Sequence, residues 1–274
     1  MNTGRSVLKA IWTSIAIPVV GINSTLGNSP STSIVLSTSG WEMVDKNEVM
    51  TVLYSTWMIF FPFSEKVKYS EIQVEQTKNS PIAFYKKTKD GKYRIGLSAN
   101  NRNWCQYVFQ FAHELGHIIC GFKEGDQSNQ WFEESICEAA SLFALQQIAS
   151  TWEVSPPHTD WKAYAVEFKN YRKQRVLDSS YPENFHLASW WEQNRSILSR
   201  NSSLRKENLW IAITLLHLIE KDPDVAWSAC GWLNHCKRKE FKSFENYLKD
   251  WKNTCQNFEQ KEFVQKVMRA FGLS

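Results

Sequence analysis

Residues 104–121 read WCQYVFQFAHELGHIICG, and this stretch decides the expected fold because it combines a helical repeat with a pair of histidines. Its apolar side chains recur at the spacing of one face of an α-helix. They are Val108, Phe111, Leu115, Ile118 and, just beyond the stretch, Phe122. Asn101–Asn103 offers side chains that can cap the start of a helix, and Gly121 is a natural end. The stretch therefore predicts one amphipathic helix, Trp104–Gly121.

The two histidines of this helix, His113 and His117, are four residues apart. They share one face, so their imidazoles can converge on one ion. Glu114 follows the first histidine and is placed to act as general base on a water held by that ion. The pattern predicts one Zn²⁺ per chain, with His113 and His117 as metal ligands and Glu114 as the catalytic residue. Small side chains on the same face, where a second helix can approach, are Ala112, Gly116 and Cys120.

A third protein ligand is needed to complete such a site. The three-histidine form of the motif does not fit, because its glycine and third histidine would fall at Cys120 and Lys123. A second helix, from Trp131 to about Ser150, begins WFEESICEAAS and supplies three acids. One face of it is acidic and otherwise small, and consists of Glu134, Cys137, Glu138, Ser141 and Leu145.

Among these acids we predict that Glu134 is the metal ligand. The segment between His117 and Glu134 has room for a turn at Gly121 and an antiparallel return. Glu133 is about 100° away around the helix and should face a different surface. Glu138, about 6 Å further along the axis, is expected to accept a ring N–H and so orient a histidine. The exchange of roles between Glu134 and Glu138 stays open.

FAHELGH, preceded by predicted strands, resembles the gluzincin clan of zinc metallopeptidases, especially the ImmA/IrrE-type and other minimal gluzincins. WFEES resembles the W-x-N-E-G segment that carries the glutamate ligand in gluzincin aminopeptidases, with Glu133 where asparagine is usual. The resemblance covers about residues 70–150 and implies a zincin-like fold and hydrolysis of peptide bonds. It also implies that an extended substrate lies along a sheet edge formed by Tyr93–Ala99. No G-x-M-E-N exopeptidase segment occurs, so exopeptidase activity is not implied.

The segment before the histidine-bearing helix predicts the rest of an α+β fold. Asp45 can cap a helix that runs to about Phe61, with Pro62 ending it. Its apolar face consists of Val49, Leu53, Trp57 and Phe60. Three strands should follow, in a small antiparallel sheet with a turn at Asp90-Gly91. These strands are Glu71–Gln76, Pro81–Lys87 and Tyr93–Ala99.

Three regions follow from these elements. Residues 1–40 are expected to form a signal peptide or a flexible arm, with a linker over residues 23–40. Residues 41–152 are expected to form the zincin catalytic core. Residues 153–274 are expected to form a mainly helical C-terminal region packed on the core. Arg5 and Lys9 precede the apolar run Ala10–Ile22, an order that slightly favours export. The run is short and contains Pro18, so no integral membrane span is expected.

Composition supports a soluble globular chain, with 43% hydrophobic and 22% charged residues among 274. The net charge of +4 is spread along the sequence, so no nucleic-acid partner is expected. No C-x-x-C pair occurs among the six cysteines. Cys230 and Cys236 are near enough to form a disulfide, although buried free thiols are favoured for all six.

The leading functional hypothesis is a zinc metallopeptidase acting on peptide or protein substrates. The alternative is a regulatory or sensor zincin that binds or cleaves one dedicated partner protein, without general protease activity. A third, a zincin used only for interaction, is disfavoured because Glu114 is intact. Several downstream side chains are candidates for an oxyanion-stabilising donor, and the sequence does not choose among them. They are His158, Tyr164, Tyr171, Tyr181 and His186.

Overall fold

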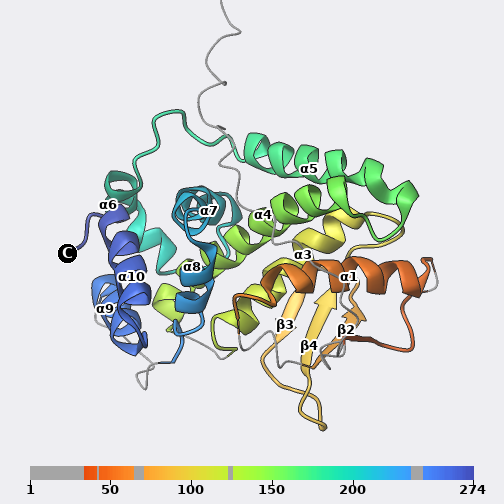
Figure 1. Cartoon of the computed structure of the whole chain (residues 1–274). Coiled ribbons are helices and arrows are strands. Elements are labelled where there is room, and N and C mark those ends of the chain that lie inside the picture. Colours follow the sequence, from red (N-terminus) through yellow and green to blue (C-terminus); the bar gives the residue numbers. More distant parts are fainter. Residues whose placement is uncertain (1–33, 42, 65–70, 123–125, 236–242) are drawn as a thin grey trace, which may run out of the picture.

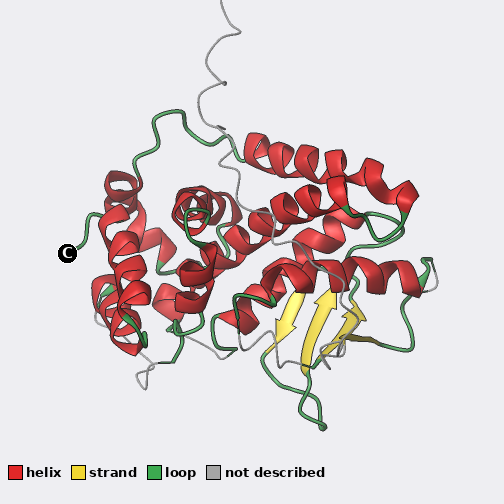
Figure 2. Cartoon of the chain, viewed as in Figure 1, coloured by secondary structure: helices red, strands yellow, loops and turns green. Residues whose placement is uncertain are grey.

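The computed structural model describes residues 34–41, 43–64, 71–122, 126–235 and 243–274. One small sheet packs against a larger body of helices, so the fold is α+β as predicted (Figure 2). None of the helices in these described ranges is both long and apolar enough to cross a membrane. The predicted signal peptide falls on residues 1–27, outside the described residues.

The sheet has four strands: β1 (Ile34–Leu36), β2 (Ile72–Gln76), β3 (Ile82–Phe84) and β4 (Tyr93–Leu97). Their order across the sheet is β1-β2-β4-β3. The prediction of an antiparallel sheet holds for β3 and β4 but is wrong for β2 and β4, which pair in parallel; β1 also pairs with β2 in parallel. Helix α1 carries the chain back between β1 and β2, which makes that pair parallel. The turn at Asp90-Gly91 joins β3 to β4, and Gly91 adopts a φ of 87° there.

Two further expectations about the strands need correction. Ile34–Leu36 lies inside the stretch 23–40, predicted as linker, but forms β1, because a strand of three residues carries too little alternation to be recognised. Tyr93–Ala99 is not a sheet edge, since β4 pairs with a strand on each side. The edge that borders the histidine-bearing helix is β3, Ile82–Phe84.

Helix α1 (Lys46–Phe60) confirms its prediction closely. The Asp45 carboxylate accepts a hydrogen bond of 2.7 Å from the backbone N–H of Asn47 and caps the helix. The four side chains of the predicted apolar face are fully buried. Helices α1 and α3 both pack on the sheet, and α1 also touches α3 (Figure 1).

Helices α3 (Trp104–Ile119) and α4 (Gln130–Val154) form the centre of the molecule. They pack closely because the site of contact has small residues: a Cβ added to Gly116 would lie 2.9 Å from the sulfur of Cys137. The Ser141 hydroxyl donates to the carbonyl of Phe109 across the helix pair, at 2.8 Å. Asn103 precedes α3 but makes no capping bond; its amide donates instead to Asn100.

The C-terminal region is mainly helical, as predicted. It comprises a short 3₁₀ helix at Thr159–Ala163 and the helices α5 (Tyr164–Asp178), α6 (Leu187–Leu198), α7 (Arg205–Ile219), α8 (Pro223–Cys230), α9 (Phe244–Thr254) and α10 (Phe258–Ala270). Another short 3₁₀ helix, Gln127–Asn129, directly precedes α4. Helices α5 and α7 both pack along α4 (Figure 1). The start of α4 is held by aromatic contacts to α9, such as Trp131 against Phe244 at 4.7 Å. Cys230 is a buried free thiol, and Cys236 lies outside the described residues.

Candidate metal centre

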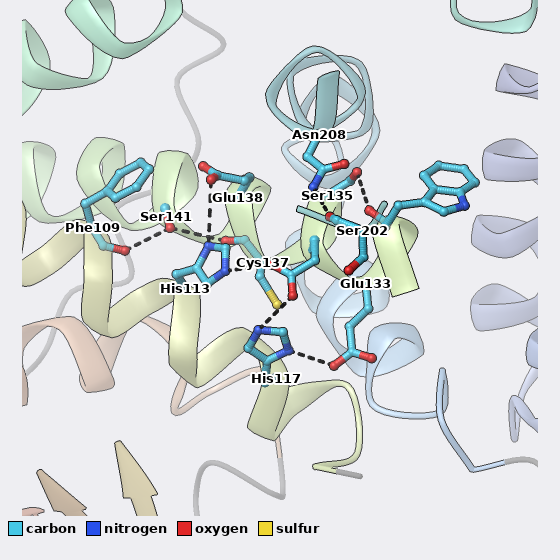
Figure 3. A network of polar contacts seen from close by, with 12 residues as sticks. Phe109, His113, His117, Glu133, Ser135, Cys137, Glu138, Ser141, Ser202 and Asn208 are labelled. Carbon is cyan, nitrogen blue, oxygen red and sulfur yellow. Dashed lines mark hydrogen bonds and ion pairs between the residues drawn. The ribbon is translucent and has the colours of Figure 1, made fainter. Parts of the chain in front are cut away.

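His113 and His117 project from α3 towards the first turns of α4 (Figure 3). The structure brings Glu134 to both of them: its Oε2 lies 3.2 Å from His113 Nε2, and its Oε1 lies 3.7 Å from His117 Nε2. Two ligands of a tetrahedral zinc ion stand about 3.3 Å apart, since each bond is about 2.0 Å. Both distances are near that separation, and they involve different oxygens of Glu134.

Glu133 contacts the other nitrogen of His117, where its Oε1 lies 2.8 Å from Nδ1 (Figure 3). The expectation that Glu133 faces a different surface is therefore wrong. The His117 ring projects between two neighbouring positions of α4, so successive carboxylates approach opposite edges of one imidazole. A buried carboxylate on Nδ1 holds the ring with Nε2 directed at the metal position.

A second layer of hydrogen bonds holds Glu133. The side-chain amide of Asn234 donates to Glu133 Oε2 at 2.6 Å, and the Asn234 backbone N–H donates to the carbonyl of Cys120 at 3.1 Å. The Tyr247 hydroxyl donates to the side-chain amide oxygen Oδ1 of Asn234 at 3.4 Å. Sequence reasoning missed Asn234, which is 101 residues from Glu133 and carries no local motif.

Glu138 lies beside His113, with 4.0 Å between its Oε1 and His113 Nδ1. That distance is too long for a direct hydrogen bond, so the predicted role of Glu138 as partner of the ring N–H stays a prediction. Its other oxygen, Oε2, is buried and has no hydrogen-bond partner among the described residues. Burial raises the pKa of Glu138, and the charges of His113 and Arg175 oppose that shift.

The charges of the site are unbalanced in favour of anions. Burial lowers the pKa of His117, but the hydrogen bond and charge of Glu133 outweigh it and raise the pKa to about 9. The pKa of His113 is also raised: burial lowers it, but the hydrogen bond with Glu134 and the charges of Glu114 and Glu138 outweigh that effect. Three carboxylates surround two imidazoles here, and Glu114 adds a fourth. Buried acids in such excess are compensated by protons or by a bound cation.

Glu114 lies next to the edge strand β3. It is 3% exposed. Burial raises its pKa, while the charges of His113 and His117 and the backbone N–H of Ala83 in β3 favour the carboxylate. A carboxyl group with a raised pKa is a better proton acceptor near neutral pH than an exposed glutamate.

Cys137 offers a competing ligand atom. Its sulfur and one ring nitrogen from each of His113 and His117 lie within 4.8 Å of one another. Its thiol is fully buried, and burial raises its pKa well above the usual range, so it is a neutral thiol here. Glu134 directs its two oxygens at the Nε2 atoms of both histidines, so Glu134 and Cys137 are both candidates for the third ligand. Cys120 is buried as well and stays a core thiol.

The histidines open into a cleft of about 660 Å³. The edge strand and Tyr85 line one wall, and residues of α5 and α7 line another. Of the five candidate oxyanion donors, Tyr171 lines this cleft, and His158, Tyr164, Tyr181 and His186 do not. His113, Glu114, His117, Glu134 and Glu138 all line it.

Tyr85 is a cleft residue that sequence reasoning did not single out. Its ring lies edge-on to His117, with 6.3 Å between centroids. Burial, and then the charge of Glu133, raise its pKa well above the usual range, so the phenol stays protonated. The only sequence signal was its place within the predicted strand Pro81–Lys87, and the observed strand β3 ends one residue before it.

Comparisons of the chain with protein-family models, with curated proteins and with solved structures gave no match.

Proposed function

We propose that this chain is a zinc-dependent metallopeptidase of the gluzincin type, with a zincin-like core. The observation that carries the proposal is the meeting of the Glu134 carboxylate with the Nε2 atoms of His113 and His117. These three residues would hold the zinc ion. Zinc bound there lowers the pKa of a bound water towards about 7 and polarises the carbonyl to be cleaved.

The chain's own residues supply the proton transfers. Glu114 takes a proton from the attacking water and gives it to the leaving amine as the C–N bond breaks. Its raised pKa supports that double role. Tyr85 and Tyr171 line the same cleft and offer protonated phenols to the developing oxyanion.

The edge strand favours a peptide as the substrate. Among the described strands β3 pairs with β4 alone, so its outer edge presents backbone groups along the cleft. An extended peptide can add to such an edge through main-chain hydrogen bonds. We expect it to lie along Ile82–Phe84, which brings a peptide bond past Glu114.

The alternative function, action on one dedicated partner protein, is favoured by the second wall of the cleft. Residues of α5 and α7 line the cleft together with the edge strand, and their side chains would restrict which substrates can bind there. A chain of this kind would cleave its partner and leave casein intact, whereas a general peptidase would cleave both.

Metal analysis of the purified full-length chain tests the proposal. We expect one zinc per chain, and we expect His113→Ala and His117→Ala each to remove it. The matched control is His217→Ala, because His217 lies in α7 and contacts the carbonyl of Ile213, away from the cleft. Full zinc occupancy in both site variants would contradict the proposal.

A further inference from the structure

The cleft wall formed by α5 and α7 carries two arginines, Arg175 and Arg205. Neither forms an ion pair with any residue in the described ranges. Arg175 lies over the ring of Phe109, 4.6 Å from its centroid, and its Nε is buried without a hydrogen-bond partner in the described part of the chain. Arg205 is the first residue of α7 and is exposed at the cleft.

The two arginines lie near the candidate metal centre. Both line the same cleft as Glu134 and Glu138. The site's acids nevertheless lie beyond ion-pair distance of both arginines. The wall therefore holds two positive charges near the candidate metal centre that no carboxylate of the described residues neutralises directly.

The third arginine of the cleft is different. Arg94, on the sheet side, pairs with Glu75 at 3.1 Å and lies over the ring of Phe84, 4.3 Å from its centroid. Its charge is already compensated. Only the α5/α7 wall offers arginines of this cleft that are available to a ligand.

We propose that Arg175 and Arg205 form a subsite for a carboxylate of the peptide substrate, supplied by an acidic side chain or by a free C-terminus. The inference rests on the proposed function, since it assumes that a peptide lies in the cleft. Guanidinium groups bind carboxylates through paired, charge-assisted hydrogen bonds. The N-terminus of α7 adds a favourable dipole at Arg205.

Peptide capture tests the subsite without requiring cleavage. The zinc-loaded full-length Glu114→Gln variant is immobilised and exposed to a random peptide library made in two forms, with a free C-terminal carboxylate and with a C-terminal amide. Retained peptides are sequenced by mass spectrometry. We expect about tenfold enrichment either of Asp and Glu at one position, or of the free-carboxylate form, as one charge-assisted contact provides. The two forms of the library distinguish the two sources.

The variant Arg175→Gln/Arg205→Gln should lose this enrichment. The matched control is Lys173→Gln/Lys206→Gln, which removes the same charge from the same two helices at exposed positions that do not line the cleft. It should keep the enrichment. Because Arg205 is exposed, Arg205→Gln alone gives a well-folded second variant and should lose part of it.

Three results would overturn the subsite: no retained peptides, retention without a carboxylate preference, or a preference that survives in Arg175→Gln/Arg205→Gln. The proposed function is judged separately, from zinc content and from hydrolysis by the wild-type chain. A chain that prefers carboxylates but cleaves nothing would contradict the peptidase and leave the subsite standing. A zinc peptidase that shows no carboxylate preference would support the proposed function and contradict the subsite.

Discussion

His117 sits between two carboxylates, and each approaches a different ring nitrogen. Glu133 faces Nδ1 and Glu134 faces Nε2. When Nδ1 donates to Glu133, the lone pair of Nε2 is left to bind a metal, so this contact selects the tautomer that a ligand needs. Glu133 therefore belongs to the candidate site as much as the residues of the motif do.

Glu114→Gln should retain zinc and stability yet lose activity. Glutamine has the shape of glutamate but cannot accept the proton of the water, and loss of a general base costs about 10²–10⁴-fold in rate. Hydrolysis of a peptide library, measured beside zinc content and thermal unfolding, checks this. Wild-type turnover by the variant would show that Glu114 is not the base.

Alanine variants of the three acids at the start of α4 should differ in how much zinc affinity they lose. Glu134→Ala should abolish tight binding, because it removes a ligand. Glu133→Ala and Glu138→Ala should weaken binding by about 10–100-fold, as expected for residues that orient a ligand. Zinc titration against a competing chelator measures all three. If Glu138→Ala strips the metal while Glu134→Ala only weakens it, the two roles are exchanged.

The competing ligand is tested in the same titration. Cys137→Ser should bind zinc with nearly wild-type affinity, because we assign its sulfur to the core rather than to the metal. Loss of zinc in Cys137→Ser, with zinc retained in Glu134→Ala, would move the third ligand from Glu134 to Cys137.

At this scale the sequence predicted side chains that share a motif or a helix face. His113 and His117 lie together because residues four apart on a helix share a face, and that geometry is local. Glu134 reaches them from α4, whose acidic face was also recognisable in the sequence. The position of Glu133 depended on where the His117 ring would project between the helices. No spacing in the sequence encodes that projection.

Among the elements, the contact between α3 and α4 depends on Gly116. An added Cβ would lie 2.9 Å from Cys137 Sγ and 3.1 Å from Cys137 Cα, and the second distance involves backbone that cannot turn away. Alanine favours an isolated helix by about 1 kcal/mol over glycine. Overpacking costs about 1–3 kcal/mol, so the steric effect should win.

We therefore expect Gly116→Ala to lower the free energy of unfolding and to weaken zinc binding, since the helices that carry the ligands must separate. Denaturant unfolding measures the first effect. The double variant Gly116→Ala/Cys137→Ala removes the closest contact and should lose less stability than the sum of the two single variants. A Gly116→Ala protein as stable as wild type would show that the helices adjust freely.

The helices were predicted well because their signals are local: periodicity, the Asp45 cap and a breaking proline. Three of the four strands were located, but β1 was missed and the strand order was not predicted. Whether a strand pairs in parallel depends on the path of the chain between strands, and β1 lies more than thirty residues before β2. Hence the edge was assigned to Tyr93–Ala99, although β4 is inserted between β2 and β3.

In the whole molecule, the C-terminal region completes the candidate site from two directions. Helices α5 and α7 supply a wall of the cleft, and the segment after α8 supplies Asn234. The sequence predicted a helical region packed on the core but gave it no chemistry. These residues reach the site only through tertiary packing, more than thirty residues beyond Glu138.

The link between this region and the metal centre is the hydrogen bond from Asn234 to Glu133. Asn234→Ala would leave a buried carboxylate oxygen of Glu133 without its donor, at a cost of about 1–3 kcal/mol of stability. Glu133 would then hold His117 less firmly, and we expect zinc affinity to fall by about tenfold, the lower end of the effect of losing an orienting partner. Chelator competition measures the affinity of the full-length variant.

Loss of stability alone must be separated from this effect. Gln260→Ala is the matched control, because Gln260 is a buried amide of α10 that bonds to the backbone N–H of Gln256 and does not line the cleft. It should lower stability comparably and leave zinc affinity unchanged. Equal zinc affinities in Asn234→Ala and wild type would show that Glu133 holds His117 without help from the C-terminal region.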